Sequence, residues 1–296
     1  MSHRLYAELG WLPSPPEDFS ARCKALPTQQ GVSGKDIRAL ANYALGENDL
    51  NRLAKAVETL RKSGQPLAPL MPIRLGLVSN STTHFLAPAL VASAARHGIL
   101  LECIEANFDQ AVQEALSPDS EISRAKPDMV LVALDHRGLP FPPSPGDAAM
   151  AKQTVSDALR HLQLIRKGVR DNSNAICIVQ TIARPVETRF GSLDISLPGT
   201  PRQLIDAFNR GLGESIADTQ DLLLDVAAMA ETVGLAEWHD ATLWNMAKIP
   251  FSHVYLPLYA DHVCRLIAAQ RGKSRRCLIL DLDNTLWTGG IGGAGL

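Results

Sequence analysis

Long apolar runs and an excess of either charge are both missing from this chain of 296 residues. No stretch approaches the roughly 18 consecutive apolar residues that a membrane-spanning helix needs, and the first residues contain no apolar signal segment. The formal net charge is -2, and residues of both signs are interspersed, which argues against a surface for nucleic acid or for anionic membranes. We therefore expect a cytoplasmic protein with no nucleic-acid and no membrane partner.

Patterned cysteines are missing as well. The chain has 5 cysteines, and no two of them stand at the C-x-x-C spacing of zinc and redox sites. The odd number and the scattered positions argue against a disulfide framework. We expect all of them to be reduced and structural. They are Cys23, Cys103, Cys177, Cys264 and Cys277.

The chain contains ample material for a core, since 46% of its residues are hydrophobic, and its length favours two or three structural units. The first unit, residues 1–68, is expected to be helical. Between residues 36 and 62 apolar side chains recur three or four positions apart, the spacing of an amphipathic helix, and Asn48 and Asp49 are expected to divide this stretch into two helices. A proline-rich stretch at 65–72 then marks a boundary.

From residue 69 to residue 250, short apolar runs alternate with helical patterns. Strand, helix and strand in repetition predict an α/β unit with a doubly wound, parallel, three-layer sheet. A linking helix is expected within 251–276, and 277–296 is expected to begin a further domain. The predicted strands are 73–78, 100–104, 129–134, 175–181 and 222–226, and the predicted helices are 86–97, 109–116, 148–170, 201–216 and 227–233.

The segment 277–287 ends an apolar run in the pattern Asp281-x-Asp283-x-Thr285. Such a run predicts a buried strand that delivers two carboxylates to the carboxyl end of a sheet. The pattern opens the site of phosphotransferases that use an aspartate nucleophile, in which Asp281 would attack phosphorus, Asp283 would handle the proton, Thr285 would contact substrate and both carboxylates would bind Mg²⁺. The few residues that follow leave no room for the remaining site elements, so we expect a truncated domain that is inactive by itself in phosphoryl chemistry.

The residues around this motif resemble one branch of the haloacid-dehalogenase superfamily. Asp-Leu-Asp-Asn-Thr-Leu-Trp followed by Gly-Gly-Ile-Gly, together with the lead-in at 244–252, is similar to FkbH-like proteins. The resemblance implies a phosphatase and glyceryl transferase that takes the three-carbon acid of 1,3-bisphosphoglycerate, removes phosphate and loads the glyceryl unit on an acyl carrier protein for polyketide biosynthesis. One departure is Gly293-Ala294-Gly295, where the family has an acidic residue.

Two loops of the predicted sheet carry a second set of polar residues. The first strand ends in Ser-Asn-Ser at 79–81, and the third ends before Asp135-His-Arg137. Since carboxyl ends of parallel strands meet at one edge, these loops are expected to lie side by side next to a helix N-terminus that can stabilise an anion. Asn80, Asp135 and Arg137 are therefore candidate substrate-binding residues.

This arrangement resembles the SGNH-hydrolase fold, and the resemblance places Ser81 at the nucleophile and Asp135 at the position of the third block. The fifth block, Asp-x-x-His, matches at Asp240, a further candidate binding residue, but Leu243 stands where the histidine belongs. A serine nucleophile needs a base to accept its proton. His84, His136 and His239 lack the required spacing, and His239 is expected on a different side of the loop from Ser81.

Three functions remain open at this point. The chain is the N-terminal part of an FkbH-like glyceryl transferase, an SGNH-type serine esterase or acyltransferase that acts through Ser81, or a module that binds an acyl carrier protein without catalysis. The sequence leaves the acyl substrate, the carrier and the oligomeric state undecided.

Overall fold

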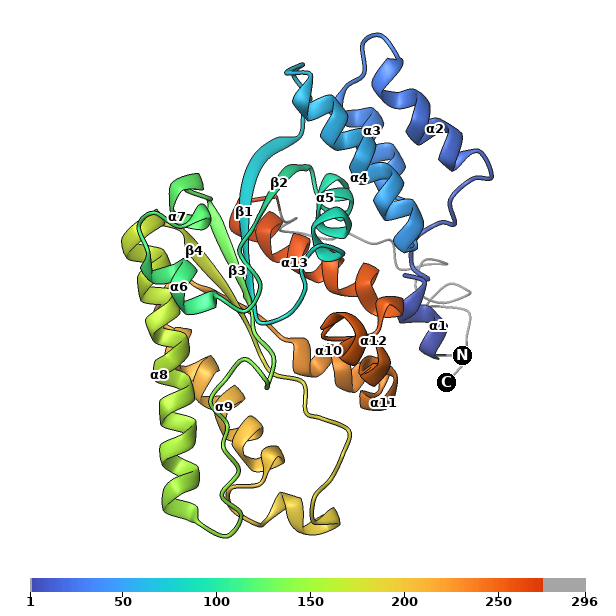
Figure 1. The fold of residues 1–296 in the computed structure, drawn as a ribbon. Helices are drawn as coiled ribbons and strands as arrows, with labels where there is room; N and C mark the ends of the chain where they lie inside the picture. The colour runs from blue at the N-terminus through green and yellow to red at the C-terminus, as the bar shows by residue number, and fades with distance from the viewer. Residues whose placement is uncertain (1, 274–296) are drawn as a thin grey trace, which may run out of the picture.

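A five-stranded parallel sheet forms the centre of the computed structural model, which describes residues 2–273 (Figure 1). The strand order is β2-β1-β3-β4-β5, and every neighbouring pair is parallel. The fold class predicted from the sequence, a three-layer α/β fold with a doubly wound parallel sheet, is confirmed. The strands are β1 (Met71–Ser79), β2 (Ile99–Glu105), β3 (Met129–Ala133), β4 (Ile176–Gln180) and β5 (Leu222–Leu224).

Helices cover both faces of the sheet because its strands are apolar on both faces. In β3, Met129 and Leu131 belong to one core cluster, whereas Val130 and Val132 belong to the other, as expected when successive side chains alternate between faces. Figure 1 shows α8 and α9 on one side and α5 and α13 on the other. One layer contains α6 (Ala111–Leu116), α7 (Glu121–Ala125), α8 (Ala148–Ser173) and α9 (Pro201–Ile216), and the other contains α5 (Leu86–Arg96), α10 (Val226–Val233) and α13 (Leu256–Gln270).

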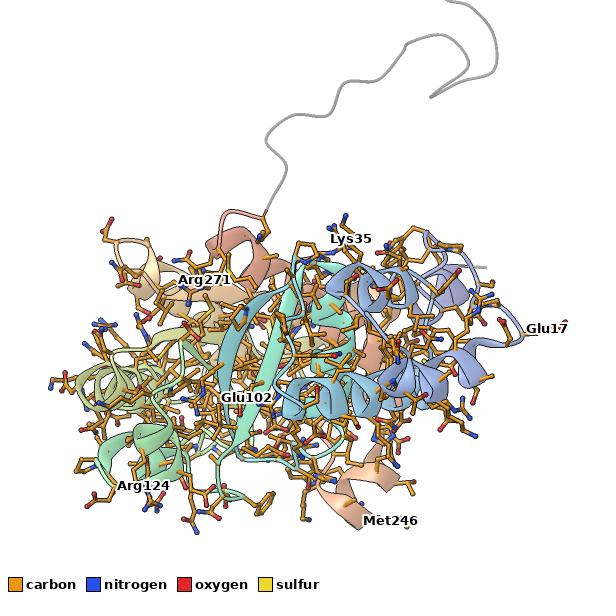
Figure 2. All side chains as sticks on the ribbon, turned by 90° about the horizontal axis from the view of Figure 1, so that it is seen from above. Glu17, Lys35, Glu102, Arg124, Met246 and Arg271 are labelled. Atoms are coloured by element: carbon orange, nitrogen blue, oxygen red, sulfur yellow. The ribbon has the colours of Figure 1, made fainter. Side chains whose placement is uncertain are left out.

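The N-terminal region is helical, and Figure 2 shows it at the end of the molecule away from Arg124. The predicted division into two helices is confirmed, but the break lies earlier than predicted: residues 42–46 separate the helices, and Asn48 and Asp49 both lie in the first turn of the second one. An acidic side chain at that place is stabilised by the positive end of the helix dipole, so it favours a helix start rather than a break. The helices are α1 (Ser2–Ala7), α2 (Phe19–Ala25), α3 (Gly34–Ala41) and α4 (Glu47–Lys62).

A buried ionic cluster joins this region to α13. Arg96 donates from Nε to the carbonyl of Ala41 (2.8 Å) and from a terminal nitrogen to the carboxylate of Asp261 (2.8 Å). His97 Nε2 lies 2.9 Å from the same carboxylate oxygen. The helix predicted as a linker is thus packed on α5 within the main core. The predicted division of the chain into domains stays a prediction.

Short helices complete the chain between β5 and α13: α11 (Leu235–Trp238), α12 (Ala241–Ala247) and the 3-10 turn η3 (His253–Tyr255). Another 3-10 turn, η2 (Gly191–Ile195), precedes α9. Within residues 2–273 no helix is both long enough and apolar enough to cross a bilayer. The four cysteines of this range are free thiols. The strand expected from residue 277, with Asp281, Asp283 and Thr285, lies outside the described residues.

Candidate functional site

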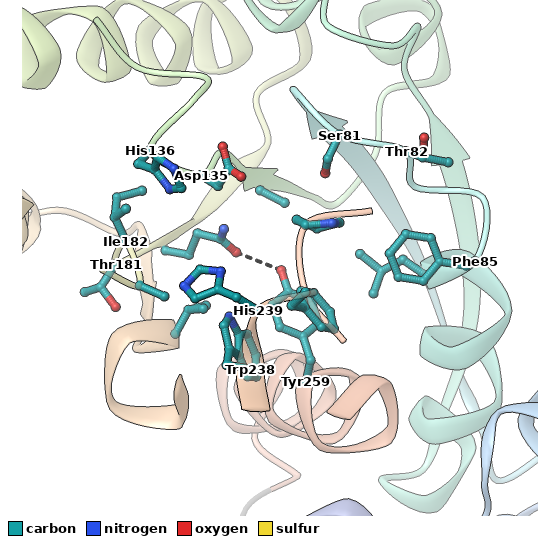
Figure 3. Close-up of a pocket in the computed structure, with 17 residues that line it drawn as sticks. Ser81, Thr82, Phe85, Asp135, His136, Thr181, Ile182, Trp238, His239 and Tyr259 are labelled. Atoms are coloured by element: carbon teal, nitrogen blue, oxygen red, sulfur yellow. Dashed lines mark hydrogen bonds between the residues drawn. The ribbon is translucent and has the colours of Figure 1, made fainter. Parts of the chain in front are cut away.

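A cavity opens at the carboxyl ends of β1, β3 and β4, where ligands bind in open α/β sheets (Figure 3). It is narrow, with a volume of about 30 Å³, which is room for roughly one or two water molecules. Ser81, His136 and His239 all border it. Most of the remaining lining is apolar and comes from Phe85, Leu86, Ala133, Ile182, Ala183, Val226, Trp238, Pro250 and Phe251, with Thr82, Asp135, Gln180, Thr181 and Tyr259 adding polar groups.

Ser81, the predicted nucleophile, has a serine as its hydrogen-bond partner. Its hydroxyl lies 2.7 Å from the hydroxyl of Ser79, and Ser79 donates its own proton to the carbonyl of Ala133 (2.7 Å). Because a hydroxyl has a single proton, Ser81 must be the donor between the two serines. The Ser81 proton, which a base would have to remove, is therefore engaged in a hydrogen bond to Ser79 Oγ.

Asn80 and Asp135 connect the loops that follow β1 and β3. Asn80 Nδ2 donates to Asp135 Oδ1 (2.9 Å), and the amide of Asp135 donates back to Asn80 Oδ1 (3.0 Å). Gly138 packs against this pair so closely that a Cβ there would lie 2.5 Å from Asn80 Cγ. The structure brings these two loops together as the sequence predicts, and the paired amide and carboxylate hold them in place.

Arg137 does not line the cavity. Its guanidinium pairs with Asp135 (2.5 Å) and lies over the ring of Trp244, 3.9 Å from the centroid. Among the described residues that line the cavity, none is an arginine or a lysine. An anionic ligand in the cavity would therefore have no cation to pair with.

Asp240 begins α12. Its Oδ1 accepts from the amide of Leu243 (2.9 Å), which is the usual role of an aspartate at a helix N-cap. Neither residue borders the cavity. The role of Asp240 as a binding residue stays a prediction. In the structure this residue caps α12.

His136 and His239 are the two candidate bases of the cavity. Burial lowers the pKa of both imidazoles below 6.5, so both are neutral at pH 7. His239 Nε2 lies 2.8 Å from the carbonyl of Arg184. A carbonyl only accepts, so Nε2 carries the proton and Nδ1 is left as an acceptor. The two rings are 6.5 Å apart between centroids.

His239 and Ser81 border the same cavity, and the prediction that His239 lies on a different side of the loop from Ser81 stays a prediction. His239 follows α11, which the buried Trp238 anchors by stacking on Phe251 with centroids 4.7 Å apart. The spacing between His239 and Asp240 along the sequence carries no information about the packing of α11. Figure 3 shows Ser81 entering the cavity from the β1 loop, with His136 and His239 on other walls.

Gln180 and Tyr259 belong to the site and were not predicted. Tyr259 donates to Gln180 Oε1 (2.8 Å), and Gln180 Nε2 donates to the carbonyl of Leu134 (3.0 Å). One amide proton of Gln180 is left for the cavity. Gln180 was detectable as a polar residue at a strand end, but Tyr259 comes from α13, and no pattern links that helix to the strand ends.

The arrangement provides a small space with neutral donors and acceptors. It holds no assembled serine–histidine pair, since the partner of Ser81 is Ser79. Within residues 2–273 no group of three or more His, Cys, Asp or Glu side chains could hold a metal ion. The site is therefore suited to a small, uncharged, hydroxylated or carbonyl-bearing group.

Comparisons with known proteins identify relatives of this chain. The model of the FkbH N-terminal domain matches residues 74–268, and no curated protein matches the chain. A crystal structure of the N-terminal part of the protein BF1531 from Bacteroides fragilis, containing a phosphatase domain complexed with Mg, is similar with a TM-score of 0.71 at 22% identity. The similarity covers 84% of this chain and 63% of that one.

A more distant likeness is to the salicylyl-acyltransferase SsfX3 from a tetracycline biosynthetic pathway. It has 16% identity and a TM-score of 0.37, and covers 68% of this chain and 55% of that one. A likeness this weak carries no argument about function.

Proposed function

This chain belongs to the family of FkbH N-terminal domains, and from this premise we propose that it binds the acyl group in an enzyme that loads a glyceryl-type unit on an acyl carrier protein. The acyl donor would be a phosphorylated three-carbon acid, 1,3-bisphosphoglycerate, and the product would serve polyketide biosynthesis. The domain would hold the acyl group without hydrolysing it.

The observation that carries the proposal is the cavity beside Ser81. A space of about 30 Å³ selects against long acyl chains, and its neutral polar groups suit the hydroxyls of a short acid. Entry of a glyceryl unit requires movement of lining side chains. Hydrolysis is disfavoured because Ser79 holds the proton of Ser81. These features support an acyl-binding role.

The phosphoryl half of the reaction would fall to residues that follow the described part of the chain. In this proposal Asp281 is the phosphoryl nucleophile, Asp283 is the acid and base, Thr285 contacts substrate, and both carboxylates bind Mg²⁺. The similar protein from Bacteroides fragilis contains a phosphatase domain and was crystallised with Mg, which supports this assignment by analogy. The domain described here would contribute the binding of the acyl group.

Binding of a neutral ester tests the proposal. Methyl glycerate, added to the 296-residue protein, is expected to shift the imidazole NMR signals of His136 and His239 without release of methanol. Ala133→Leu places a larger side chain in the cavity and should abolish the shift, whereas Ala207→Leu on the exposed face of α9 should not. Unchanged signals in the parent protein at millimolar ester would contradict the proposal.

A second candidate function is acyl transfer through Ser81. It is favoured by one observation, the neutral His239 in the same cavity with Nδ1 available as an acceptor. Rotation of the Ser81 hydroxyl from Ser79 toward a histidine would create a nucleophile and base pair. Release of methanol by the parent protein that is lost in Ser81→Ala would make acyl transfer through Ser81 the leading function.

A further inference from the structure

Gln180 ends β4, and its side chain borders the cavity. Its Nε2 donates to the carbonyl of Leu134 (3.0 Å), and its Oε1 accepts from the hydroxyl of Tyr259 (2.8 Å). Among the described residues, no acceptor is paired with the second proton of Nε2. This proton is therefore available to a ligand.

The orientation of the Gln180 amide follows from its two partners. A backbone carbonyl can only accept, so the group that faces Leu134 must be Nε2. Oε1 then faces Tyr259, and the phenol must donate to it; the dashed line in Figure 3 marks this bond. In the reversed orientation two oxygens would face each other at Leu134. The direction of the free N–H is thus set by hydrogen bonds that exist before any ligand binds.

Tyr259 is held in place by aromatic packing. It is fully buried in the main core, and its ring lies against that of Phe251 with centroids 5.0 Å apart. Phe251 stacks in turn on Trp238. Burial raises the pKa of the Tyr259 phenol above its ordinary value of 10.0, so the hydroxyl keeps its proton at pH 7. Tyr259 therefore stays a donor, and the amide of Gln180 has little freedom to turn.

The hydroxyl groups that border the cavity already donate elsewhere. Besides those of Ser81 and Tyr259, they belong to Thr82 and Thr181. Thr82 donates to the carbonyl of residue 247 (2.7 Å), and Thr181 donates to the carboxylate of Asp225 (2.8 Å). Because a hydroxyl has a single proton, none of these groups among the described lining residues has a proton left for a ligand.

Ring N–H groups border the cavity as well. His239 binds the carbonyl of Arg184 through Nε2. His136 contacts His239 edge to face, and a contact of that kind does not fix its tautomer. The indole of Trp238 is held by stacking on Phe251. Gln180 differs from these rings because two hydrogen bonds orient the amide that carries its free proton.

We propose that Gln180 donates this proton to the carbonyl oxygen of the bound acyl group, and that Tyr259 is the positioning residue that holds the amide. The inference rests on the proposed function for the presence of an acyl group. A carbonyl oxygen accepts and cannot donate, which matches a single free N–H. In a cavity of about 30 Å³ a ligand atom lies close to the lining groups. A donor that is fixed before binding avoids the entropic cost of being ordered by the ligand.

The side-chain amide signals of Gln180 in NMR spectra of the 296-residue protein test the contact. Their assignment comes from their absence in Gln180→Met. Methyl glycerate should shift the proton that faces the cavity downfield, and 3-methoxypropane-1,2-diol, the same molecule without the carbonyl oxygen, should shift it less. The signals of Gln153, which is exposed on α8, should not move. An ester that shifts the ring N–H of Trp238 or His136 and leaves Gln180 unchanged would overturn the assignment.

Calorimetric titration measures how much the contact contributes. Gln180→Met has a side chain of similar length but no N–H, so it should weaken methyl glycerate by about fivefold, the order expected for one hydrogen bond, and the diol by less than about twofold. Tyr259→Phe removes the donor to Oε1 and should weaken the ester by about threefold. Gln153→Met and Tyr43→Phe, both outside the cavity, should change neither affinity.

The carbonyl stretching band of the bound ester, measured by infrared difference spectroscopy with a labelled carbonyl carbon, separates positioning from a purely structural role. A hydrogen bond lowers the frequency of this band. We expect the lowest frequency in the parent protein, a higher one in Gln180→Met, and a broader band between the two in Tyr259→Phe, because the amide then turns more freely. Equal bands in the parent and Gln180→Met, or equal losses of affinity for ester and diol, would contradict the assignment. Melting temperatures check that each variant is folded, and the amide signals of the parent decide the question if one is not.

Methyl acetate, which has the carbonyl but no hydroxyl, separates this inference from the proposed function. A Gln180 amide that responds to methyl acetate, with histidine signals that do not respond to methyl glycerate, would reject the proposed function and keep the donor. Histidine signals that respond to methyl glycerate, with a Gln180 amide that responds to neither ester, would keep the proposed function and reject the donor.

Discussion

Ser81 donates a hydrogen bond to Ser79, so in this structure its hydroxyl is not directed at a histidine. A nucleophilic serine needs its hydroxyl oriented toward a base. His136 and His239 are neutral because burial lowers the pKa of each, so bases are present in the cavity. What decides the chemistry at this scale is the orientation of one hydroxyl.

Turnover of p-nitrophenyl acetate tests whether the Ser81 hydroxyl acts as a nucleophile. We expect the parent protein and Ser81→Ala to show equal rates close to background, because no histidine accepts the proton. Ser192→Ala, an exposed serine, is the matched control. A working general base contributes about 10²–10⁴-fold, so a drop of about a hundredfold or more in Ser81→Ala alone would establish a serine nucleophile.

Asp261 is a buried carboxylate in the ionic cluster with Arg96 and His97. Burial alone raises its pKa, but the hydrogen bond from His97 and the charges of Arg96 and Arg265 outweigh burial and lower the pKa from 3.8 to about 2. The folded-state pKa is therefore below the unfolded one. The carboxylate contributes about 2 kcal/mol above pH 4, and this contribution is lost as the pH falls from about 4 toward 2.

Urea unfolding of Asp261→Asn tests this account. At pH 7 the variant should lose about 3–5 kcal/mol, because Arg96 is left buried without its counter-charge. Its free energy of unfolding should also fall less steeply than that of the parent between pH 4 and pH 2. Asp157→Asn, which breaks the exposed pair with Arg160, should change little. Parallel pH profiles for parent and variant would contradict the assignment.

At the scale of elements, caps determine where the helices near the site begin. Asp147, Thr200, Asp225 and Asp240 each accept from an amide three residues later. Such caps satisfy backbone groups that a helix start leaves unpaired. The residue types that suggested binding roles, Asp above all, are also the best caps, and sequence alone does not separate the two roles.

Asp240 allows the two roles to be distinguished. Asp240→Ala should raise the rate of amide exchange at Leu243 by about fivefold, the equivalent of about 1 kcal/mol for a lost cap, and Asp240→Ser should restore slow exchange. Binding of methyl glycerate should be equal in all three proteins. Weaker binding in Asp240→Ala and Asp240→Ser alike would instead favour the substrate-binding role.

At the scale of the whole molecule, the described domain provides a cavity without cations. The 296-residue protein with Mg²⁺ is expected not to hydrolyse acetyl phosphate, because no arginine or lysine among the described residues lines the cavity to hold the phosphate. Release of inorganic phosphate, compared with that from Asp281→Asn, is the measurement. Phosphate release by the parent protein that is lost in Asp281→Asn would show that the phosphotransferase site is complete.

Periodicity was sufficient to predict the three-layer fold, all five strands and the helices between them except the short α7, because the periodicity of apolar residues is a local property of the chain. It also predicted that the loops after β1 and β3 meet, since parallel strands end at one edge. It misplaced the break between α3 and α4, because Asn48 and Asp49, which were interpreted as the break, lie in the first turn of α4. The second helix begins directly after its N-cap, Gly46, a local signal that the interpretation of Asn48 and Asp49 passed over.

The sequence by itself determined the fold class, the position of Ser81 and the family resemblance, because each depends on residues that are adjacent or regularly spaced. Only the tertiary structure decided that Ser79 holds the proton of Ser81, that His239 shares its cavity, and that Tyr259 of α13 orients Gln180. The last two relations join elements far apart in the chain and arise from the packing of α11 and α13 on the sheet. In the first, the serines are only two residues apart, but the direction of their hydrogen bond depends on the bond from Ser79 to the carbonyl of Ala133 in β3. Hydrogen-bond geometry of that kind is set by three-dimensional distance rather than by spacing along the sequence.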